Sequence, residues 1–120
     1  MRVVQLIPDL SVPDIPAVRG FYEDYLGLVG EELGLDWVTR FVVLGDGSAS
    51  QALQVVTTDA HAPVNPALTV AVDDVDAAYA QAPALGYEIV HPLTTPPWGK
   101  RRFFVRDPAG NVLNIAQHRD

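Results

Sequence analysis

Two tryptophans at matching places in the two halves of the chain are the residues with the clearest capacity for binding chemistry. Trp37 precedes Asp46 by nine residues, and Trp98 precedes Asp107 by nine. Indole rings stack on flat or heteroaromatic ligands, each stack contributing about 0.5–1.5 kcal/mol beyond area burial. Arg102, close after the second tryptophan, could hold a carboxylate, polarise a carbonyl, or pair with an acidic side chain of the protein. Sparse polar groups among aromatic surfaces are typical of a small-molecule pocket.

Other reactive side chains form no recognisable catalytic or metal-binding pattern. The chain has no cysteine, which excludes disulfides, thiolate catalysis and zinc–thiolate sites. The three histidines share no predicted helix or strand face; they are His61, His91 and His118. The only clustered serines, Ser48 and Ser50, lie in a turn-rich segment without a Gly-x-Ser-x-Gly motif. Nothing distinguishes the carboxylates Glu31, Asp36 and Glu88 from surface acids, so no catalytic residue is assigned.

Composition sets the class of protein and excludes some partners. The 120 residues are 48% hydrophobic, as expected for one soluble globular domain. A net charge of -7 disfavours nucleic acid and anionic membranes as partners. It would favour a cationic small ligand, although solubility alone explains it. The first apolar run, residues 3–7, is too short for a signal peptide or a membrane span, so we expect a cytoplasmic protein.

Periodicity predicts the elements that must position these residues. Asp14 is a candidate N-cap for a helix over 14–26, with Pro16 in its first turn and Gly27 at its end. A second helix is predicted over 75–85, closed by Gly86. Strands are predicted over 2–7, 28–33, 37–44, 52–57, 67–72, 87–91, 101–106 and 112–117. The order is βαβββ twice, as module one (1–57) and module two (67–120), joined by a linker over 58–66.

Several spacings recur between the modules and support duplication of one unit. Asp14 precedes Gly27 by thirteen residues, and Asp74 precedes Gly86 by twelve. The motifs that recur are Val12-Pro13-Asp14-Ile15 with Leu26-Gly27-Leu28, and Val72-Asp73-Asp74-Val75 with Leu85-Gly86-Tyr87; Arg40 and Arg101 also match. The chain closes with Asp107-Pro108-Ala109-Gly110-Asn111 between two strands, a turn in which proline fixes φ and glycine supplies a positive φ.

With these motifs in order, the sequence resembles the vicinal oxygen chelate superfamily, which includes glyoxalase I, extradiol dioxygenases and bleomycin-resistance proteins. The resemblance implies an α+β fold in which tandem βαβββ modules form a curved mixed sheet, or cup. It also implies where a metal would bind in the metal-dependent members: usually His on the first strand and Glu on the last strand of each module. Counted in this sequence, those positions are held by Ile7, Ala67, Gln54 and Asn114. None of these side chains is a good ligand for a divalent ion, so we expect no metal and no cofactor.

The family pattern and the repeat together predict the lining of the cup. Residues that alternate with Asn114 along its strand share its inward face. The predicted ligand-binding residues are Trp37, Thr39, Phe41, Gln54, Trp98, Arg102, Phe104 and Asn114.

The resemblance and the missing metal ligands favour a binding protein of the bleomycin-resistance type. Such a protein sequesters a small molecule, an antibiotic for example, and its chains typically pair, so we expect a homodimer. One alternative is a metal-free lyase or isomerase in which Arg102 acts on a carbonyl or carboxylate. A metal-dependent enzyme of the glyoxalase or dioxygenase type is the remaining alternative.

Overall fold

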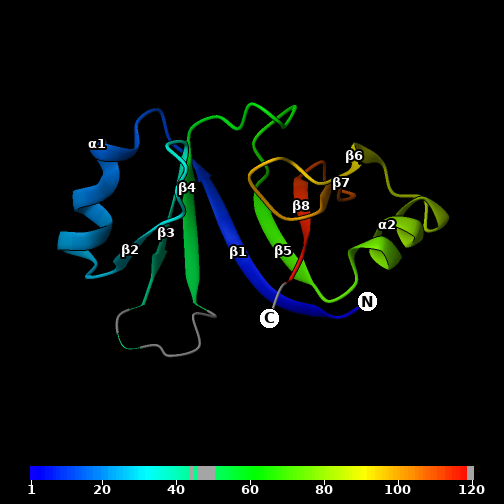
Figure 1. Ribbon diagram of the computed structural model, residues 1–120, viewed down its shortest axis with the longest axis horizontal. Helices are drawn as coiled ribbons and strands as arrows, with labels where there is room; N and C mark the ends of the chain where they lie inside the picture. Colours follow the sequence, from blue (N-terminus) through cyan, green and yellow to red (C-terminus); the bar gives the residue numbers. More distant parts are fainter. Residues whose placement is uncertain (44, 46–50, 119–120) are drawn as a thin grey trace.

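The computed structural model describes residues 1–43, 45 and 51–118, and its strands form one curved mixed sheet (Figure 1). The strand order is β2-β3-β4-β1-β5-β8-β7-β6. The strands are β1 (Val3–Ser11), β2 (Val29–Glu32), β3 (Val38–Val42), β4 (Ala52–Val56), β5 (Leu68–Val72), β6 (Ile89–Thr94), β7 (Arg102–Arg106) and β8 (Val112–Gln117). The helices are α1 (Ile15–Gly20), the π-helical turn η1 (Phe21–Tyr25) and α2 (Val75–Ala84). The predicted α+β fold with a cup-shaped mixed sheet is confirmed.

Aspartates begin both α-helices, as their positions predict. The Asp14 carboxylate accepts a hydrogen bond from the Ala17 N–H at 3.1 Å, and Asp74 accepts one from the Ala77 N–H at 3.0 Å. The first helix departs from prediction because α-helical geometry ends at Gly20 and the next five residues widen into η1. None of the helices in the described part of the chain is long and apolar enough to cross a bilayer.

The two first strands meet at the centre of the sheet. β1 pairs antiparallel with β5 and parallel with β4, and β5 pairs parallel with β8. Each half therefore repeats the same strand order about the β1–β5 seam, with α1 and α2 at opposite ends of the molecule (Figure 1). β1 runs to Ser11, four residues beyond its predicted end at Ile7. This extension carries Asp9 into the sheet beside Gln54.

Each half has its own hydrophobic core on the helix-bearing face. Under α2 the core is built from Val70, Val72, Val75, Ala78, Ala82, Phe103 and Ile115. Under α1 and η1 it is built from Ile15, Phe41 and Val55, with Val18 and Tyr22 packed against them. Because side chains alternate along a strand, the neighbours of these core residues face the other side of the sheet, where the cup lies.

Candidate functional site

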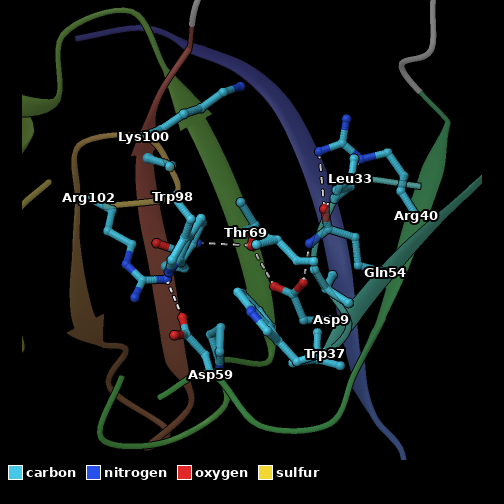
Figure 2. Close-up of a pocket in the computed structure, with 17 residues that line it drawn as sticks. Asp9, Leu33, Trp37, Arg40, Gln54, Asp59, Thr69, Trp98, Lys100 and Arg102 are labelled. Atoms are coloured by element: carbon cyan, nitrogen blue, oxygen red, sulfur yellow. Dashed lines mark hydrogen bonds and ion pairs between the residues drawn. The ribbon is translucent and has the colours of Figure 1, made fainter. Parts of the chain in front are cut away.

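A cavity of about 330 Å³ occupies the concave face and is lined by both halves of the sheet (Figure 2). Its polar lining is Asp9, Arg40, Gln54, Asp59, Thr69, Lys100, Arg102 and Asn114. Its apolar lining is Leu33, Leu35, Trp37, Val38, Val56, Pro66, Trp98 and Ala116, with Gly99 at the edge. The volume and the combination of apolar walls with polar groups that converge on one cavity are those of a site for a small organic molecule.

Four polar side chains from the four central strands meet at the cavity floor. Gln54 Nε2 donates to Asp9 Oδ1 at 2.7 Å, and Thr69 Oγ1 donates to Asp9 Oδ2 at 2.6 Å. Asn114 Nδ2 donates to Thr69 Oγ1 at 3.2 Å. Sheet register sets this arrangement, because Asp9 pairs with Gln54 and Thr69 pairs with Asn114 across neighbouring strands. The floor is thus a hydrogen-bonded quartet that joins the two halves.

All donors of the quartet point toward one carboxylate. Arg40 Nε and Nη2 donate to Gln54 Oε1 at 3.3 and 3.1 Å, so the chain of donors runs from Arg40 through Gln54 to Asp9. Asp9 is only 6% exposed, and its carboxylate accepts hydrogen bonds from the neutral side chains of Gln54 and Thr69. Burial raises the pKa of Asp9, partly offset by the hydrogen bonds from Thr69 and Gln54 and by the charge of Arg40. A buried acid with a raised pKa in a cavity is a candidate functional group.

The quartet corrects the predicted metal-ligand positions. Ile7 is buried in the sheet and Ala67 is exposed, and neither lines the cavity. Asp9 and Thr69, each two residues further along the strand, hold the first-strand places beside Gln54 and Asn114. The sequence signal for Asp9 was its even separation from Ile7, which places both on one face of the strand.

The donor set at this floor does not fit a catalytic metal ion. The floor offers one carboxylate, one hydroxyl and two amides in place of the imidazoles and carboxylates that such a centre needs. These four side chains are also already hydrogen-bonded to one another. Among the described residues, no group of three or more His, Cys, Asp or Glu side chains could hold a metal.

Arg102 occupies the second-module wall, where it pairs with an acidic residue of the protein. Arg102 Nη1 lies 2.7 Å from Asp59 Oδ2, and both side chains are about 5% exposed. Arg102 Nη2 also donates to the His61 carbonyl at 3.2 Å. The guanidinium stands over the Trp98 ring at 4.8 Å and the Phe104 ring at 5.2 Å. The segment 58–66, expected only as a linker, therefore also anchors this wall.

The two tryptophans contact each other across the cup. Their ring centroids are 5.0 Å apart with an interplanar angle of 69°, an edge-to-face pair. A flat ligand between two rings needs parallel faces about 7 Å apart, so this arrangement leaves no slot between Trp37 and Trp98. The structure brings the matched tryptophans together, but as an aromatic bridge between the halves rather than as an open clamp.

Five of the eight predicted ligand-binding residues line the cavity: Trp37, Gln54, Trp98, Arg102 and Asn114. The placement of Thr39 and Phe41 in the cup is wrong. Both lie on the helix-bearing face of β3, where Phe41 stacks on Tyr22 at 5.1 Å. Phe104 faces the cup side of β7 but is completely buried beneath Arg102 and does not line the cavity.

A register error explains the misplaced residues. Aligning the two tryptophans matches Phe41 with Arg102. In the sheet, however, Arg40 pairs with Gln54 and Phe104 pairs with Asn114, so Arg40 is the structural counterpart of Phe104. The true offset between the modules differs by an odd number, which turns every side chain of β3 to the opposite face. Arg40, missed by sequence reasoning, takes the inward place.

Several buried polar atoms around the second-module wall form no hydrogen bond with any described residue. They are Trp98 Nε1, Arg102 Nε, Asn114 Oδ1 and His91 Nε2. His91 lies behind the wall against Phe104, with ring centroids 5.4 Å apart, and does not line the cavity. Burial, and then the charge of Arg102, lower the pKa of His91 and favour its neutral form. A buried polar group costs roughly 1–3 kcal/mol unless a ligand or an ordered water satisfies it.

The family described as Glyoxalase/Bleomycin resistance protein/Dioxygenase superfamily matches residues 3–115. This chain belongs to that superfamily. Its members include glyoxalases, epimerases and dioxygenases. No curated protein matches the sequence significantly.

Solved structures share this superfamily fold over nearly the whole chain. A superfamily member from Vibrio splendidus 12B01 is 17% identical with a TM-score of 0.67, covering 98% of this chain and 100% of that one. Methylmalonyl-CoA epimerase from Mycobacterium tuberculosis is 19% identical with a TM-score of 0.69, covering 98% and 90%. The Mn(II)-bound glyoxalase from Novosphingobium aromaticivorans is 23% identical with a TM-score of 0.67, covering 97% of this chain and 39% of that one. At these identities the likeness concerns the fold alone.

Proposed function

We propose that this protein binds a small organic molecule in the cup without a metal ion, in the manner of a bleomycin-resistance-type binding protein. The observation that carries the proposal is the floor quartet. Where metal-dependent members place ligands, Asp9, Gln54, Thr69 and Asn114 are bonded to one another beneath a cavity of about 330 Å³. A cavity of that size suits a metabolite-sized ligand.

A thermal-shift screen of chelator-treated protein tests this proposal. The panel holds divalent metals, bleomycin-like antibiotics and small aromatic or carboxylate metabolites. A ligand at about 100 times its dissociation constant adds roughly 2.7 kcal/mol of stability, which a melting curve resolves. We expect stabilisation by an organic compound and not by metals, with the gain lost in Asn114→Leu and kept in the exposed control Leu85→Ala. Stabilisation by metals alone contradicts the proposal.

Asp9 supports a second candidate function, metal-free proton transfer on the bound molecule. Its carboxyl group lies at the cavity floor and accepts hydrogen bonds from neutral side chains, and burial raises its pKa, which is the direction that acid–base catalysis near neutral pH requires of a carboxyl group. Turnover of a bound compound by chelator-treated protein, lost in Asp9→Asn while binding remains, would establish this function. Binding without turnover in the wild type leaves the binding function alone.

We further propose that the chain forms a homodimer through the uncovered face of β1. Val3, Leu6 and Leu10 lie opposite core residues of the helix-bearing side of the sheet, between the regions covered by α1 and α2, and are 47%, 54% and 40% exposed. A row of exposed aliphatic side chains on a sheet face is typical of an interface. Light scattering should show a dimer that Leu6→Lys converts to monomer. Leu85→Lys, at a more exposed position at the end of α2, should remain dimeric.

A further inference from the structure

The charge of the cup differs in sign from the charge of the whole chain. The chain carries -7, yet its cavity is lined by three basic residues and two acidic ones. One of the acids, Asp59, is already neutralised by Arg102 at 2.7 Å. The other, Asp9, has both carboxylate oxygens occupied by hydrogen bonds from Gln54 and Thr69.

Arg40 is a cation of this cavity whose observed partner among the described residues is a neutral amide. Its Nε and Nη2 donate to the neutral amide oxygen of Gln54, and no carboxylate oxygen of the described residues lies within 4.0 Å of its guanidinium. Glu31 is its cross-strand neighbour on β2 but forms no ion pair with it. A half-buried guanidinium with neutral partners retains both its charge and its capacity for further hydrogen bonds.

The charges are also separated along the cavity. In Figure 2, Arg40 lies on the side of the cavity opposite the Arg102–Asp59 pair. The apolar side chains of Leu33 and Val38 line the same cavity. This arrangement matches a molecule with an apolar body and a negative group at one end.

We propose that the ligand of the cup is a small organic anion, such as a carboxylate, and that Arg40 selects for its negative charge. This inference rests on the proposed binding function of the same cavity. A cationic ligand, which the net charge of the chain would favour, finds no free carboxylate here because Asp59 and Asp9 are both engaged.

Two fluorescent dyes that share one aromatic framework test the inference without knowledge of the natural ligand. 8-Anilinonaphthalene-1-sulfonate carries one negative charge, and N-phenyl-1-naphthylamine is the same framework without it. Charge-assisted hydrogen bonds are worth about 1.5–3 kcal/mol, so we expect the anionic dye to bind the wild type about tenfold or more tightly. Raising the ionic strength should weaken only the anionic dye.

Three variants assign the preference to Arg40. Arg40→Gln should lose about tenfold or more in affinity for the anionic dye and nothing for the neutral one, whereas Arg40→Lys should keep part of the preference. Arg2→Gln makes the same change of charge at an exposed site outside the cavity and should bind as the wild type does.

Each other outcome has a distinct meaning. Equal affinity of the wild type for both dyes, without salt dependence, overturns the inference even if the variants fail to fold. A folded Arg40→Gln variant that still prefers the anionic dye also overturns the inference. Dye binding that is lost only in Leu6→Lys overturns it as well, because the dye would then lie on the exposed face of β1. Failure of both dyes to bind contradicts the proposed function of the cavity itself.

Discussion

Removing the carboxylate of Asp59 should destabilise the protein more than any surface change of the same kind. The Arg102–Asp59 pair is separated by 2.7 Å and is about 95% removed from solvent. Asp59→Asn keeps the shape and the bond that Oδ1 accepts from the His61 N–H at 2.8 Å, but it turns an amide donor toward the guanidinium. Breaking a buried pair from one side costs about 3–5 kcal/mol because it leaves an uncompensated charge.

A double-mutant cycle isolates the pair. Arg102→Met alone should also cost about 3 kcal/mol or more, because it strands the buried Asp59 carboxylate. The double variant removes both charges, so its cost should fall well below the sum of the single costs, giving a coupling energy of roughly 2–3 kcal/mol.

Urea denaturation followed by circular dichroism measures these differences in the free energy of unfolding. In a thermal melt, the melting temperature of Asp59→Asn should be roughly 10–20 °C below that of the wild type. Asp76→Asn is the matched control, because Asp76 pairs with Arg101 at 3.0 Å on the surface and should contribute about 0–1 kcal/mol. The reasoning is refuted if Asp59→Asn costs no more than this control, or if the costs of the single variants simply add.

Three further predictions test the site and the fold. Because burial raises the pKa of Asp9 above its ordinary 3.8, the folded protein holds a proton there that the unfolded chain loses first. The free energy of unfolding of the wild type should therefore fall relative to that of Asp9→Asn as pH rises from about 4 through the raised pKa. Urea denaturation at several pH values measures this difference, and a difference that stays constant with pH would contradict the prediction. The edge-to-face contact of Trp37 with Trp98 should give a coupled circular-dichroism signal that Trp98→Phe removes. If the spectra of the two single-tryptophan variants simply sum to the wild-type spectrum, the two rings are not in contact. Phe41→Ala should cost about 3–5 kcal/mol in chemical denaturation, since Phe41 is 1% exposed in the core, and should leave dye affinity in the folded protein unchanged.

Features that depend on neighbours along the chain could be predicted from the sequence. The caps at Asp14 and Asp74 are made three residues away, and the closing turn is held by Asp107, whose carboxylate accepts from the Ala109 and Asn111 N–H groups at 2.9 Å. The hydrogen bond from the Asn111 side-chain amide, and after it these backbone hydrogen bonds, lower the pKa of Asp107. Such local chemistry, repeated in order through both halves, is enough to indicate the superfamily and its fold.

The composition of the site was partly predictable for a different reason. Gln54 and Asn114 lie on last strands that continue from well-defined turns, and Trp37 and Trp98 stand at the same place in each repeat. These residues could be located by counting from a fixed point, and all four line the cavity.

Tertiary structure alone decided which side chains meet and which face they take. Asp9 enters the floor because β1 extends beside β4, and Arg40 rather than Phe41 turns inward because of the pairing register of β3. The partners Asp59 and Arg102 are far apart in sequence and lie together only once the segment 58–66 closes over the second module. A strand reverses its faces with a shift of one residue, and register is fixed by the packing of the whole sheet. For that reason the sequence by itself determined the fold and the part of the site that can be counted from fixed turns, while the charge and hydrogen bonding of the cup emerged only from the folded sheet.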